Sequence, residues 1–200
     1  MPNRFAPRSR SRSARTFETL EPRQRFLVVC EGEQTEPNYF LAFRVTGLEL
    51  KVIGAGDNTK NLVSIADNLR ARSDYDQVWV VFDRDSFPPA HFNEAIQRAS
   101  ARGIRVAYSN EAFELWYILH FDYLQAGVER SRYMSMLTER MGREYRKNDR
   151  DIFDLLLLYQ ETAIKNATRL ASSYDPLRPE QANPSTSVHL LVTELRKFAR

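Results

Sequence analysis

The 200-residue chain has 42% hydrophobic and 28% charged residues, which is typical of a globular protein and excludes a disordered polymer. It contains no run of about eighteen consecutive apolar residues, so we expect no membrane span. The N-terminal arginines are not followed by an apolar stretch, so we expect no secretory signal. The single cysteine, Cys30, cannot form an internal disulfide, which fits a reducing compartment. Together these features predict a cytoplasmic protein.

The positive charge of the chain is concentrated at its start. The net charge is +3 and the isoelectric point is near 9.1, but residues 1–16 contain five arginines and no acidic residue. The rest of the chain is therefore slightly acidic. Residues 1–22 contain too little apolar surface to build a core, and we expect a disordered basic tail. This tail is either an arm that binds phosphates or a dispensable terminus, and both interpretations stay open.

From residue 26 onward, short apolar runs alternate with helical patterns. Strands are expected over residues 26–30, 50–54, 78–82 and 104–109, and helices from about residue 35, over 58–73 and over 88–102. The first of these strands is apolar throughout, as expected for a central parallel strand that is buried on both faces. This order predicts an α/β fold with a mostly parallel, Rossmann-like sheet flanked by helices.

The remainder of the chain is expected to be helical. Residues 111–121 form a strongly apolar segment, 131–142 a weaker helix, 151–173 one long helix, and 185–199 a final helix capped by Ser185 or Ser187. Prolines make residues 175–184 a loop. We therefore predict an α/β domain over residues 23–125 and a helical C-terminal extension over residues 126–200 that packs on it.

Acidic residues follow two of the predicted strands. Glu31, Glu33 and Glu36 come after the first strand, and Asp83 and Asp85 come directly after the third. Functional groups of open parallel sheets lie beyond the carboxyl ends of the strands, so these side chains converge if the two strands are neighbours. Crowded carboxylates need a cation or raised pKa values, and hard oxygen ligands favour Mg²⁺ or Mn²⁺. The alternative is that the two aspartates form only a turn or a helix cap.

Further candidates lie later in the chain. Glu114 interrupts an apolar segment after the fourth strand, so it must face solvent, a metal or a basic residue, and we favour the sheet edge where Asn110 also lies. Lys147 or Arg84 would balance the charge of a phosphate, although such residues are more often only part of the surface. No glycine-rich phosphate loop occurs, so we do not expect this chain to hydrolyse ATP itself.

Four sequence blocks resemble a known family: VVCEGEQTEPNYF, VVFDRDSF, SNEAFELWYILHF and NPSTSVHLLVTEL, which span about residues 26–195. They are similar to the RloB-like family, Toprim-related proteins linked to restriction and phage-defence loci. The resemblance implies a Toprim-like sheet with Glu31 as an acid/base or metal ligand, and with Asp83 and Asp85 as metal ligands. It also implies a partner ATPase of the ABC/AAA type, because family members are often encoded beside one.

The first functional hypothesis is a Mg²⁺- or Mn²⁺-dependent endonuclease that acts in phage defence by abortive infection. Its catalytic residues would be Glu31, Glu114 and Lys147; its metal ligands would be Glu31, Asp83, Asp85 and Glu36; and a second metal would draw on Glu33, Glu36 or Glu114. The second hypothesis is a non-catalytic binding subunit of a defence complex that contains an ATPase. The third is a phospho-acceptor domain with Asp83 as the acceptor. The choice between DNA, RNA and tRNA as the substrate stays open, as does assembly into a homo-oligomer.

Overall fold

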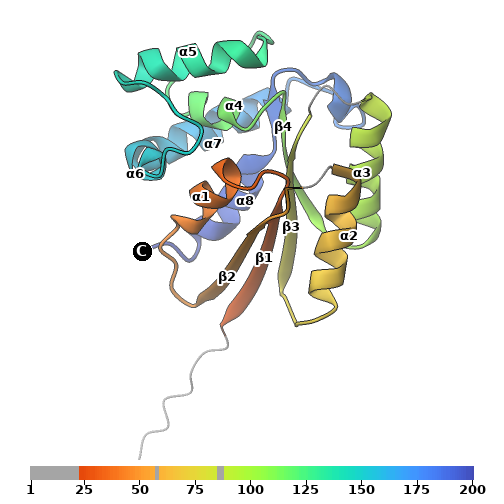
Figure 1. The fold of residues 1–200 in the computed structure, drawn as a ribbon. Helices are drawn as coiled ribbons and strands as arrows, with labels where there is room; N and C mark the ends of the chain where they lie inside the picture. The colour runs from red at the N-terminus through yellow and green to blue at the C-terminus, as the bar shows by residue number, and fades with distance from the viewer. Residues whose placement is uncertain (1–22, 57–58, 85–87) are drawn as a thin grey trace, which may run out of the picture.

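A sheet of mostly parallel strands forms the centre of the molecule (Figure 1). The computed structural model describes residues 23–56, 59–84 and 88–200, so the predicted tail over residues 1–22 and the candidate ligand Asp85 lie outside the described residues. The strands are β1 (Gln24–Cys30), β2 (Leu48–Gly54), β3 (Gln77–Asp83), β4 (Arg105–Asn110) and the short β5 (Ser185–Thr186). Their order is β2-β1-β3-β4-β5; the first four are parallel, and β5 is antiparallel to β4. The predicted α/β fold is confirmed.

Strand β1 has a neighbouring strand on each side and a layer of helices on each face. Phe26, Val28 and Cys30 belong to one apolar core, whereas Leu27 and Val29 belong to another. Because successive side chains of a strand point to opposite faces, a strand covered on both faces needs an uninterrupted apolar run. This requirement explains the FLVVC sequence.

Two helices cover the face of the sheet that carries Leu27 and Val29. They are α2 (Thr59–Arg70) and α3 (Pro89–Ala101), shown in Figure 1 on the side away from α1. Their apolar positions recur at helical spacing, and Leu62 and Phe92 are among the side chains that they bury against the sheet. This layer matches the two helices predicted between the second and fourth strands.

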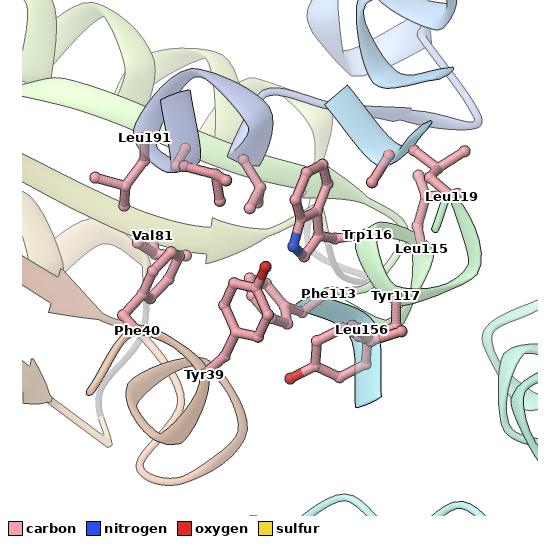
Figure 2. Close-up of a cluster of buried hydrophobic side chains, with 14 of the residues drawn as sticks. Tyr39, Phe40, Val81, Phe113, Leu115, Trp116, Tyr117, Leu119, Leu156 and Leu191 are labelled. Atoms are coloured by element: carbon pink, nitrogen blue, oxygen red, sulfur yellow. The ribbon is translucent and has the colours of Figure 1, made fainter. Parts of the chain in front are cut away.

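The other face of the sheet is covered by a larger group of helices. They are α1 (Thr35–Leu41), α4 (Glu114–Ile118), α5 (Arg130–Met141), α6 (Ile152–Leu156), α7 (Gln160–Ala171) and α8 (Val188–Arg196). Figure 2 shows their shared core, in which the Tyr39 ring of α1 meets Phe113 and Trp116 edge-on. In the described ranges, every helix is too short or too polar to cross a membrane.

The prediction of one long helix over residues 151–173 is wrong, because the helix is interrupted near its middle. Helix α6 is followed by one tighter 3₁₀ turn, Leu157–Tyr159, before α7 begins at Gln160. The buried positions Ile152, Leu156 and Gln160 keep the spacing of a continuous helix, so the hydrophobic period gives no sign of the change. The turn leaves Leu158 88% exposed.

The start of the final helix also differs from the prediction. Ser185 lies in β5, and Ser187 precedes α8 without capping it through its side chain. The Ser187 hydroxyl instead accepts a hydrogen bond of 2.8 Å from the backbone N–H of Tyr108 in β4. Pairing with the edge of the sheet therefore replaces the cap. The predicted boundary near residue 125 stays a prediction, although β5 and α8 attach the C-terminal segment directly to β4.

Candidate functional site

The carboxyl ends of β1 and β3 bring two of the predicted acidic residues together. Glu31 directly follows β1, and its backbone N–H donates a hydrogen bond of 2.8 Å to the carbonyl oxygen of Val81. Its side-chain Oε2 accepts a hydrogen bond of 3.2 Å from the backbone N–H of Asp83, the last residue of β3. The convergence follows from the strand order, because β1 and β3 are parallel neighbours.

Two further carboxylates lie within electrostatic reach of this pair. Glu36, in the first turn of α1, is 7% exposed, and Glu114, the first residue of α4, is 4% exposed. Burial raises the pKa of Asp83 well above its usual range, and the charges of Glu36 and Glu114 raise it further. Burial also raises the pKa of Glu36, against the effect of a backbone hydrogen bond. We call Glu31, Glu36, Asp83 and Glu114 the carboxylate cluster.

Glycines determine how closely the loop after β1 approaches its surroundings. A Cβ atom on Gly54, the last residue of β2, would lie 2.7 Å from the Cα of Glu33 and 2.8 Å from the carbonyl oxygen of Gly32. A Cβ atom on Gly32 would collide with the Glu36 carboxylate. The loop is also tied to the chain after β2, because Ala55 donates a backbone hydrogen bond of 2.8 Å to Cys30. The glycines thus let the loop that begins with Glu31 cross the end of β2.

Two residues that the sequence did not single out contact the carboxylate cluster. Arg130, the first residue of α5, places its Nη2 3.6 Å from Oδ2 of Asp83, and its charge lowers the pKa values of Asp83 and Glu36. The hydroxyl of Tyr145 donates a hydrogen bond of 3.3 Å to Oε1 of Glu114. Neither residue lies in a recognisable motif. Both belong to segments that are distant in sequence from β1 and β3, so only the folded chain brings them to the cluster.

The remaining predicted residues have other environments. Lys147 is exposed on the loop between α5 and α6, and its carbonyl oxygen accepts a hydrogen bond of 3.0 Å from the Thr35 hydroxyl. Glu33 is exposed beside Gly56. Asn110 is buried, and its amide donates a hydrogen bond of 2.7 Å to the carbonyl oxygen of Ala182, so it joins β4 to the loop before β5. Arg84 is partly buried just after β3.

The donor set of the cluster consists of carboxylate oxygens, which suits Mg²⁺ or Mn²⁺ better than zinc. Burial raises the pKa of the Cys30 thiol, as does the charge of Glu36, so the nearby sulfur is a poor ligand. Among the residues that the structure describes, no three His, Cys, Asp or Glu side chains form a ready-made metal site. Asp85 lies outside that part of the chain, so metal binding stays a prediction that the donor chemistry fits.

Comparisons with known proteins identify the family of the chain. No curated protein and no solved structure matches it. A family model described as RloB-like protein matches residues 26–195, which include every described residue of the carboxylate cluster together with Arg130 and Tyr145. Because this match covers most of the sequence, the chain belongs to the RloB-like family.

Proposed function

We propose that this protein is a divalent-metal-dependent endonuclease that cleaves phosphodiester bonds of nucleic acid and acts with a partner ATPase in phage defence. The observation that carries the proposal is the contact of Glu31 with Asp83 at the carboxyl ends of two parallel strands, with the charges of Glu36 and Glu114 close enough to raise the pKa of Asp83. Carboxylates of low exposure that repel one another are costly to a fold, and a bound divalent cation would offset more of that repulsion than Arg130 does alone. The Toprim-like order of the acidic residues supports the same reaction class.

The metal would be held by Glu31, Asp83 and Glu36, together with Asp85. When bound, a divalent ion would lower the pKa of an attacking water and neutralise charge on the phosphate. The hydrogen bond from the Asp83 backbone to Glu31 orients that carboxylate toward β3. A carboxylate that is held in place in this way costs less to reorganise during the reaction.

Other side chains would serve the substrate. Glu114, which accepts a hydrogen bond from the Tyr145 hydroxyl, would accept or return a proton as a general base or acid. Arg130 contributes positive charge beside Asp83, where a phosphate would otherwise meet only carboxylates. Lys147, on the exposed loop beside α1, would balance a second charge of the substrate. These roles extend the catalytic set of Glu31, Glu114 and Lys147 by one arginine.

The test combines Asp83→Asn with a control at an exposed carboxylate. Asp83→Asn keeps the size of the side chain but removes a ligand, so Mn²⁺ affinity measured by calorimetry should fall by more than the roughly 10- to 100-fold typical of an outer-shell change. Cleavage of single-stranded RNA, single-stranded DNA and duplex DNA should be lost in parallel. Glu161→Gln on α7, where the carboxylate is 84% exposed, should change neither property.

Two outcomes would count against the proposal. Undiminished Mn²⁺ binding and cleavage by Asp83→Asn would overturn the assignment of the site. A wild-type protein that binds Mn²⁺ and nucleic acid but cuts none of these substrates, alone or with the proposed partner ATPase, would favour the non-catalytic binding subunit.

A further inference from the structure

The loop between α5 and α6, residues 142–151, is fastened to the candidate site. Tyr145 in this loop is 3% exposed, and its hydroxyl donates to Glu114 of the carboxylate cluster. Its backbone N–H donates a hydrogen bond of 3.0 Å to the Thr138 hydroxyl. Two residues later, the carbonyl oxygen of Lys147 accepts from Thr35, the residue next to Glu36. The loop is therefore fastened beside the cluster at two points, by the Tyr145–Glu114 bond and by the Thr35–Lys147 bond.

The exposed side chains of this loop are mostly basic. Two of the arginines already form ion pairs within the loop. Nη1 of Arg143 lies 2.5 Å from Oδ2 of Asp149, and Nη2 of Arg146 lies 2.7 Å from Oε2 of Glu144. Lys147 and Arg150 are exposed and make no ion pair with any residue that the structure describes. Lys147 and Arg150 are therefore the two cations of this loop whose charge no acidic side chain in the described residues neutralises by an ion pair.

We propose that Lys147 and Arg150 contact the phosphate backbone of a nucleic-acid strand and lay it across the carboxylate cluster. This inference rests on the proposed function. A cluster of carboxylates repels a polyanion, so the substrate needs cations beside the cluster to bring it close. Contacts to phosphates set the position of a nucleic acid without reading its sequence. Lys147, Arg150 and the buried Tyr145 belong to one short loop, and Tyr145 is hydrogen-bonded to Glu114. A strand bound by the two cations would therefore lie at a fixed distance from Glu114.

The experiment compares two charge-matched double variants of the full chain. Lys147→Ala with Arg150→Ala removes the proposed contacts. Lys51→Ala with Arg72→Ala removes the same charge from exposed positions on the side of the sheet that carries Leu27, α2 and α3. Lys51 of β2 pairs in register with Leu27, and Arg72 follows α2. Binding is measured by fluorescence anisotropy on a labelled 30-nucleotide single-stranded DNA and on RNA of the same sequence. Ca²⁺ replaces Mg²⁺, and a series of salt concentrations is used.

Each lost phosphate contact lowers the salt slope of single-strand binding by about 0.7, so the loop variant should lose about 1.4. If wild type and loop variant bind equally at 1 M salt, a slope difference of about 1.4 makes the variant bind roughly 25-fold more weakly than the wild type at 0.1 M salt. The control variant should bind like the wild type, and Mn²⁺ titrations of both variants should be unchanged. Lys147→Arg with Arg150→Lys, which keeps both charges, should retain binding, and the unchanged Mn²⁺ titration of the alanine variant excludes its misfolding.

Several results would overturn the inference. Unchanged binding by the loop variant would refute it, while the proposed nuclease would stand if the wild type still binds and cleaves nucleic acid. Equal losses in the loop and control variants would show only the general effect of net charge. A loss of association with the partner ATPase alone would make the loop a protein-docking surface. A wild type that binds neither probe would overturn this inference and the proposed function together.

Discussion

Removal of the Tyr145 hydroxyl tests whether the hydrogen bond to Glu114 holds the α5–α6 loop in place. Tyr145→Phe keeps the ring and its edge contact with Tyr117, whose centroid lies 6.2 Å away, but it takes the donor away from a carboxylate that is 4% exposed. Hydrogen bonds to charged groups contribute about 1.5–3 kcal/mol. The separation of 3.3 Å is long for such a bond, so we expect the free energy of unfolding to fall by about 1–2 kcal/mol.

The assay is urea unfolding of the metal-free protein, followed by a double-mutant cycle. Glu114→Met removes the acceptor at similar side-chain length and leaves the Tyr145 hydroxyl without its partner. In that background, Tyr145→Phe should be neutral or stabilising, which gives a coupling of about 1–2 kcal/mol between the two positions. Thermal unfolding should agree, with about 2–4 °C lost for each kcal/mol in a chain of this size.

A particular pattern in the cycle would refute this reasoning. If Tyr145→Phe costs the same free energy with Glu114 as with Met at position 114, the two side chains are not coupled. The loop would then be held by the burial of the Tyr145 ring and by the Thr138 and Thr35 hydrogen bonds, and Glu114 would need another explanation for its burial.

Two further predictions concern the loop after β1 and the core. Gly54→Ala should cost about 1–3 kcal/mol and weaken Mn²⁺ binding, because its Cβ would push on the backbone of Glu33. Gly47→Ala is also strained, by about 1–2 kcal/mol, because Gly47 has a φ of +75°, but its Cβ meets nothing within 4 Å, so this comparably destabilised control should keep its Mn²⁺ affinity. Equal Mn²⁺ affinities for the two variants would contradict this account. Burial lowers the pKa of His120 to about 4 from 6.5, so the unfolded state binds the proton first and stability should fall as the pH drops through 6.5 toward 4. In urea unfolding, His120→Phe should reduce the loss between pH 7 and pH 5 by about 2 kcal/mol, and identical pH slopes would contradict the prediction.

Local patterns in the sequence were enough to predict the fold class and to single out all four acidic residues of the carboxylate cluster. The apolar runs of β1 and β3 are long and unbroken because both strands are buried on both faces, and that signal needs no knowledge of the neighbours. Glu31 and Asp83 each lie directly after such a run. Parallel strands place their carboxyl ends at one edge, so the sequence also predicted that these side chains would meet.

Only the tertiary structure decided what surrounds these carboxylates. Arg130 and Tyr145 reach the carboxylate cluster from segments that no spacing connects to β1 or β3, and Tyr145 and its partner are 31 residues apart. The requirement for glycine at position 54 likewise depends on a loop of another strand crossing above it. Periodicity reports which face of an element is buried, but it does not report which partner buries it. Long-range packing brings Arg130 to Asp83 and the Tyr145 hydroxyl to Glu114, so these two contacts form only once the chain is folded.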